Sequence, residues 1–106
     1  MMDDRSIRSV LARRRRGKIL ELLRACEPHA IPDVRDLYRL LQNTGEVLTI
    51  DDLIGLLKDL KQRNCVKFDS RYRDRQDLPE ITLIRLDSRG RDVLEGSTED
   101  PGIDAR

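Results

Sequence analysis

Residues 64–96 read NCVKFDSRYRDRQDLPEITLIRLDSRGRDVLEG and carry the strongest fold signals of the chain. Two apolar, β-branched runs, Cys65–Phe68 and Ile81–Leu86, predict the strands of a hairpin. In the second run, positions 81, 83 and 85 alternate with positions 82, 84 and 86, which is typical of a strand with two distinct faces. The stretch between the runs, Asp69–Glu80, is too long and too charged for a tight turn. We therefore expect an extended loop, with its exit restrained by Pro79.

A short helix is predicted directly after the hairpin. Asp87 or Ser88 supplies the N-cap, and Gly96 ends the helix in the position where a left-handed residue is favoured. Val93 and Leu94 are its apolar positions.

An amphipathic helix, Thr49–Arg63, precedes the hairpin with no linker. Thr49 is the expected N-cap, and Asp52 three residues later gives a weaker form of the capping box. The residues expected to face the core are Leu53, Leu56, Leu57 and Leu60.

Before it, residues Ile31–Gln42 predict another helix, with Pro32 in its first turn. Asp33 and Asp36 favour its N-terminal end, and Asn43, Thr44 and Gly45 end it. Its expected buried stripe is Val34, Leu37, Tyr38 and Leu41.

The N-terminal region has an interrupted apolar pattern. Helical spacing in residues 3–12 gives way to Arg13–Lys18, which has no apolar residue, and resumes at Ile19. Two interpretations stay open: one long helix with a solvated middle, or a short helix leading into a second one, ended by Pro28. We divide the chain into an N-terminal helical extension (1–12), one domain (13–96) and a flexible tail (97–106) whose apolar content is too low to fold.

Length and composition indicate one small domain of 106 residues, with 38% hydrophobic, 39% charged and 3% aromatic residues. The sequence shows no membrane-spanning run and no signal-peptide core, so a cytoplasmic protein is expected. The net charge of +1 conceals a gradient: eight basic and four acidic residues lie among the first 27, and one basic and three acidic among the last ten.

The run ITLIRLDSRGRDVLEG resembles the wing strand, turn and final "x-x-G-x-x-x-L-x-G" helix of small bacterial and phage regulators. Over Arg14–Gly96 the chain is similar to prokaryotic winged helix-turn-helix proteins, including small ones carried by Mu-like prophages. The resemblance implies a mainly α fold with a small β-hairpin. It also implies a non-enzymatic transcriptional regulator that binds double-stranded DNA, with Thr49–Asn64 in the major groove and the wing, Asp69–Glu80, at the minor groove or backbone.

Three groups of basic residues are candidate nucleic-acid contacts. Four consecutive arginines point to all sides of a helix, so they cannot form one flat patch. Either two or three of them contact phosphate together, or the run is a solvated surface whose arginine stems cover apolar neighbours. The wing arginines alternate around Tyr72, which suits a narrow minor groove unless nearby acids neutralise them. The candidates are Arg13, Arg14, Arg15 and Arg16 in the run, Lys58, Lys61 and Arg63 late on the third helix, and Arg71, Arg73 and Arg75 in the wing.

The third helix also carries features that disfavour DNA. Asp51 and Asp52 would repel phosphate, and Gly55 stands where a reading side chain is expected. The alternative hypothesis is therefore a winged-helix module for protein interaction or assembly that does not bind DNA.

The remaining candidates concern association and chemistry. Ile7, Val10 and Leu11 form a strip too short to be stable alone, so we expect it to pack on the domain or on a second chain, giving a homodimer. His29 has no nucleophile or metal partner, and Cys26 and Cys65 fall on core-facing positions. No catalytic residue, metal site or cofactor is predicted.

Overall fold

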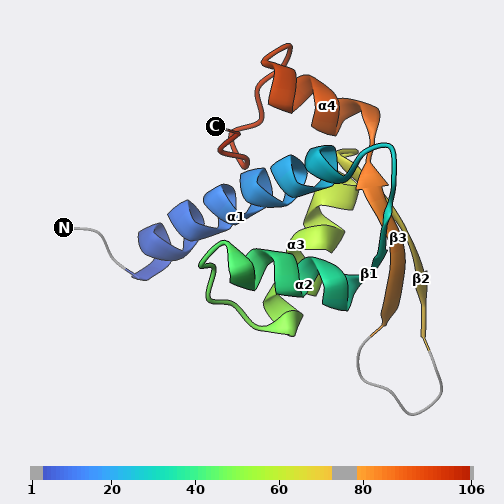
Figure 1. The fold of residues 1–106 in the computed structure, drawn as a ribbon. Coiled ribbons are helices and arrows are strands. Elements are labelled where there is room, and N and C mark those ends of the chain that lie inside the picture. Colours follow the sequence, from blue (N-terminus) through green and yellow to red (C-terminus); the bar gives the residue numbers. More distant parts are fainter. Residues whose placement is uncertain (1–3, 73–78, 106) are drawn as a thin grey trace.

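The computed structural model describes residues 4–72 and 79–105 and contains, within these ranges, four helices and a three-stranded antiparallel sheet (Figure 1). The strands lie in the order β1-β3-β2, and α1, α2 and α3 pack together beside the sheet. The expected combination of helices with a hairpin is confirmed. The elements are α1 (Asp4–Cys26), β1 (Ile31–Asp33), α2 (Val34–Asn43), α3 (Ile50–Gln62), β2 (Val66–Arg71), β3 (Glu80–Leu86) and α4 (Ser88–Glu95).

Helix α1 is continuous, which decides between the two interpretations of the N-terminal region. The arginine run does not interrupt it, because arginine has a high helix propensity, but the middle of the helix is not fully solvated: Arg15 and Arg16 are half-buried and Gly17 is buried. Its second half enters the core through Ile19, Leu20 and Leu23, whereas Ser6–Val10 are all exposed.

The prediction that a helix begins at Ile31 was wrong. Residues Ile31–Asp33 form the short strand β1, and α2 begins at Val34. Ile31 pairs with Ile84 and Asp33 with Thr82, so β1 forms one edge of the sheet. Pro32 is tolerated there because an edge strand leaves some N–H groups unpaired. Asp33 keeps an extended backbone and accepts a hydrogen bond from Arg35 N at 2.8 Å, so it is the N-cap of α2, and the expected end at Thr44 and Gly45 is confirmed.

The start of α3 follows the prediction. Thr49 is the N-cap, and its side chain and that of Asp52 exchange hydrogen bonds with each other's backbone N–H, which completes the capping box. Hydrogen bonding to Thr49 holds the pKa of the Asp52 carboxyl below its ordinary value. The bond to the Thr49 backbone has the larger effect and the bond to its side chain the smaller one. The buried face comprises Leu53, Ile54, Leu56, Leu57 and Leu60.

The hairpin strands extend further toward the loop than expected, so the predicted loop Asp69–Glu80 includes residues at both ends that belong to strands. β2 continues to Arg71, which stands opposite Glu80 at the start of β3. The strict alternation predicted for the second strand was also wrong. The register shifts between Lys67 and Asp69 because β3 has one extra residue there, and Leu83 adopts a left-handed φ of 53°. The shift brings Ile81 and Ile84 to the same buried side, while Leu83 is 48% exposed.

Helix α4 has the predicted caps, since Asp87 accepts from Ser88 N and Gly96 closes the helix at φ 78°. The helix packs closely on the start of β2. The N–H of Asp87 donates to Cys65 O at 2.9 Å, and a Cβ added at Gly90 would collide with the same carbonyl.

The tail predicted to be flexible is instead packed onto the domain through residue 105. Ile103 belongs to the hydrophobic core, and Asp100 is buried. The N–H of Asp104 donates to Arg13 O at 3.0 Å, and a Cβ at Gly17 would collide with Asp104 O. A low apolar content was misleading because polar contacts and one isoleucine secure this segment. We call residues 97–105 the strap.

Candidate nucleic-acid interface

The arginine run of α1 divides between solvent and intramolecular partners. Arg13 is exposed, whereas Arg14 and Arg15 both approach the buried carboxylate of Glu46, at 3.1 Å and 3.5 Å. Arg15 also donates to Val47 O at 2.6 Å, and only 18% of its side chain is exposed. These two arginines therefore fasten the turn between α2 and α3, residues 44–49, to α1.

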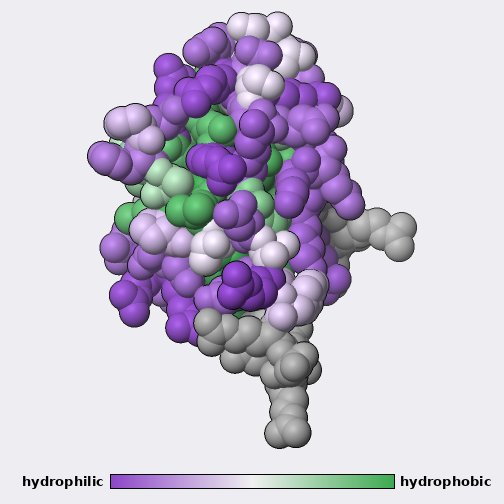
Figure 2. All heavy atoms as spheres, turned by 90° about the vertical axis from the view of Figure 1, so that its right-hand side faces the viewer, coloured by the Kyte–Doolittle hydropathy of each residue, from purple (hydrophilic) through white to green (hydrophobic). Residues whose placement is uncertain are grey.

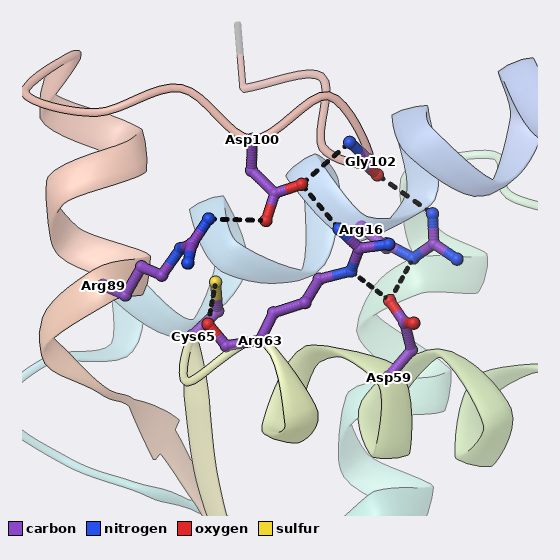
Figure 3. Close-up of polar contacts among 7 residues, drawn as sticks. All are labelled: Arg16, Asp59, Arg63, Cys65, Arg89, Asp100 and Gly102. Atoms are coloured by element: carbon purple, nitrogen blue, oxygen red, sulfur yellow. Dashed lines mark hydrogen bonds and ion pairs between the residues drawn. The ribbon is translucent and has the colours of Figure 1, made fainter.

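Arg16 and Arg63 belong to a second cluster, shown in Figure 3. Both reach Asp59 Oδ2, Arg63 through a 2.7 Å hydrogen bond from Nε and Arg16 at 2.8 Å without the alignment of a hydrogen bond. The hydrogen bond to Asp59 raises the pKa of the Arg63 guanidinium. Arg16 and Arg63 thus lie between α3 and the strap.

The strap side of this cluster centres on Asp100, whose side chain is 3% exposed. Its carboxylate accepts from Arg63 Nη1 at 2.6 Å, from Arg89 Nη2 at 3.3 Å and from the backbone N–H of Gly102 at 2.8 Å. Arg16 adds a 2.9 Å hydrogen bond to Gly102 O (Figure 3). Charge-assisted hydrogen bonds are stronger than neutral ones, so these contacts fasten the strap to α1, α4 and the end of α3.

Sequence reasoning missed these partners. Glu46 lies 32 residues from Arg14, and Gly102 lies 86 residues from Arg16, so no local pattern links them. Their use as DNA contacts stays a prediction, but each of Arg14, Arg15, Arg16 and Arg63 already has a partner in the folded chain.

A different basic surface joins α3 to the hairpin, and we call it the helix–hairpin surface: Lys58, Lys61 and Tyr72. Lys58 Nζ lies 3.4 Å from Tyr72 Oη. Lys61 Nζ lies 4.4 Å from the centroid of the Phe68 ring and donates to Phe68 O at 3.4 Å. Within the described ranges neither lysine forms an ion pair with a carboxylate, and both residues are exposed.

Two of the three wing arginines, Arg73 and Arg75, lie outside the described residues. Arg71 is exposed at the end of β2, opposite Glu80 in the register. Lys67, which the sequence did not single out, is held 3.7 Å from Asp87.

The exposed stripe of α3 carries Asp51 and Gly55 ahead of Lys58. A Cβ built on Gly55 meets nothing within 4 Å, so the centre of this stripe is bare. Its N-terminal end is acidic, since Asp51 and Asp52 are both exposed. The charge of α3 therefore changes from negative to positive along its length.

The strip predicted for dimerisation is accessible in its first part. Ile7 is 44% and Val10 43% exposed, while Leu11 is half-buried.

The groups considered for catalysis are one histidine and two cysteines. His29 is exposed and Cys26 is half-buried, and burial raises the pKa of the Cys65 thiol, which disfavours the nucleophilic thiolate. Among the described residues no three metal-ligating side chains gather. None of the helices found in those ranges combines the length and apolar character needed to cross a bilayer.

The face turned toward the viewer in Figure 2 is largely polar, with apolar side chains reaching the surface in its middle. Next to β1 the surface has a shallow apolar hollow. Its lining comprises Cys26, His29, Ala30, Ile31, Pro32, Asp36, Arg39 and Leu40.

Comparisons of the chain with protein-family models, with curated proteins and with solved structures give no match.

Proposed function

We propose that this chain is a winged helix-turn-helix protein that binds double-stranded DNA and acts as a non-enzymatic transcriptional regulator. The order of elements supports the fold: α2 and α3 are joined by a short turn, the hairpin β2–β3 follows α3 directly, and β1 completes the sheet beside β3. In this arrangement α3 is the helix offered to a groove, and the hairpin is the wing.

The observation that carries the proposal is the helix–hairpin surface. Among the described residues its lysines are the cations of α3 that no carboxylate neutralises, in contrast to Arg63 on the turn that follows. Tyr72 brings the hairpin to Lys58, so one surface spans the two elements that a duplex would contact. Because solvent-facing lysines and arginines neutralise phosphates, this is where the backbone of DNA is expected to lie.

The test is a fluorescence-anisotropy titration of a labelled random-sequence duplex at low and at moderate salt. We expect binding that weakens as salt rises, because each neutralised phosphate releases a counterion. In the triple variant Lys58→Ala, Lys61→Ala and Arg71→Ala the slope of log K against log salt should fall by about 0.9 for each phosphate that is no longer neutralised.

The matched control is Arg24→Ala, which removes an exposed cation from the last turn of α1 and should leave the slope unchanged. No detectable binding of the wild-type chain at low salt would refute the proposal.

A second candidate function, binding of a protein partner, is favoured by the acidic end of α3. Two exposed carboxylates at Asp51 and Asp52 repel a duplex but suit a basic protein surface. The double variant Asp51→Asn and Asp52→Asn separates the two ideas. It should tighten DNA binding if α3 lies along the duplex, and it should leave DNA affinity unaltered if this end of α3 serves a protein.

A further inference from the structure

Three of the five large hydrophobic side chains that are exposed within the described ranges come from one end of the molecule. Ile7 and Val10 belong to the first turns of α1, whose residues Ser6–Leu11 we call the arm. Val47, in the α2–α3 turn, is 86% exposed. In Figure 1 the arm extends past this turn, on the side of the molecule away from the sheet.

Contacts made by Arg15 show that the arm, the turn and the start of α3 share one corner. Arg15 donates to Val47 O at 2.6 Å, and its positive charge helps to lower the pKa of Asp52. Leu11 lies one helical turn before Arg15, and Ile7 one turn before Leu11, so all three follow the same stripe of α1. The apolar stripe of the arm thus continues outward from the place where α1 meets Val47.

The two sides of this corner are complementary in chemistry. The arm presents Ile7 and Val10 with the exposed cation Arg8, whereas the turn presents Val47 beside the exposed acids Asp51 and Asp52. The arm's apolar side chains lie beyond the packed part of α1, so a surface that covers them would remove apolar area from water. The turn of an identical chain offers an apolar residue and the opposite charge.

We propose that a second copy of this chain covers the corner, the arm of each copy packing on the α2–α3 turn of the other. Such an exchange is isologous, because each copy supplies both halves of the contact and the assembly closes as a two-fold dimer. The apolar part of the contact is small compared with the roughly 800 Å² per partner of a stable interface, so the dimer should dissociate in the micromolar range or above. The proposal does not depend on DNA binding.

Sedimentation velocity of the full chain over a concentration series tests the dimer. The arm variant Ile7→Ser with Val10→Ser and the turn variant Val47→Ser should each raise the dissociation constant about tenfold or more. The control Leu83→Ser removes from β3 a hydrophobic side chain about as exposed as those of the arm, and it should leave the dissociation constant unchanged. Circular dichroism shows whether each variant keeps the fold, which is expected because all these side chains are exposed.

Two outcomes overturn the proposal. One is a wild-type chain that stays monomeric at about 1 mM. The other is a dimer that the arm variant weakens and Val47→Ser does not, because then arm pairs with arm. A charge exchange gives a further check: Arg8→Asp alone should weaken the dimer, and Arg8→Asp combined with Asp51→Arg should restore it. Failure of the second change to restore the dimer also counts against the arm-on-turn contact.

Discussion

Leu83 has a backbone conformation that leucine rarely adopts. Its φ of 53° lies in the left-handed region, where the Cβ of an L-residue crowds the following carbonyl at a cost of about 1–2 kcal/mol. The residue is one of the two in β3, with Ile84, that lie opposite Phe68 at the register shift, and about half of it is exposed. The bulge is what brings Ile84 into the core, so the strain at one residue serves the packing of the next.

The effect of replacing Leu83 on stability should therefore depend on whether the new residue accepts a left-handed φ, more than on its hydrophobicity. Leu83→Asn should leave the free energy of unfolding within about 0.5 kcal/mol of wild type, because asparagine accepts left-handed φ. Leu83→Val should cost about 1 kcal/mol or more, because a β-branched side chain is crowded in that region. Urea unfolding of both variants measures the difference, and a valine variant more stable than the asparagine variant would contradict this account.

Two helical glycines show how elements differ in what they need from the same residue type. Gly17 is buried in α1, and a Cβ there would collide with the backbone of Asp104 in the strap. Gly55 is exposed in α3, and a Cβ there would meet nothing within 4 Å. One glycine permits two elements to touch, and the other leaves α3 less stable than it needs to be.

Substitution by alanine at these two positions should therefore change the free energy of unfolding in opposite directions. Gly55→Ala should raise the free energy of unfolding by about 0.5–1 kcal/mol, because alanine loses less backbone entropy in a helix. Gly17→Ala should lower it despite the same gain in propensity, because the strap must move away from α1. Thermal and urea unfolding compare the pair directly, and stabilisation by both substitutions would show that the strap does not press on Gly17.

Elements with local signals could be predicted from the sequence. The capping pair Thr49 and Asp52, and Asp87 and Gly96 around α4, act within a few residues, so their side chains alone indicate where helices begin and end. β1 could not be predicted in this way. Its three residues are a strand only because β3 lies beside them, and Pro32 in isolation is typical of the first turn of a helix.

The candidate site shows the same limit. A run of four arginines is visible in the sequence, but the acids that engage three of them come from the α2–α3 turn and from α3. The lysines of α3 were predicted as candidate contacts, but the sequence does not show that their partners within the described ranges are Tyr72 and Phe68 of the hairpin and not carboxylates.

At the scale of the whole molecule, Asp100 connects the strap to two other parts of the fold. Arg63 follows α3 and Arg89 lies on α4, and both donate to this one buried carboxylate. Asp100→Asn keeps the shape of the side chain but removes the charge. The arginines are 31% and 44% exposed, so water offsets part of the loss. We expect the free energy of unfolding to fall by about 1–3 kcal/mol.

The control for this substitution is Glu99→Gln, which removes the same charge from an exposed neighbour. It should change the free energy of unfolding by less than about 0.5 kcal/mol. If the two variants lose the same free energy of unfolding in urea, the hydrogen bonds of the buried Asp100 carboxylate add nothing to stability beyond the loss of one negative charge.

The strap also has a consequence for the order of events during synthesis. Arg16 is made early and its partner at residue 102 is made 86 residues later, and Ile103 completes a core that begins with Ile19. These contacts can close only after the whole chain between residues 16 and 102 has been made, and pairings between such distant residues also slow the search for the native state. Helices α1 to α3 contact one another and are made first, so they can pack together before the strap closes on α1.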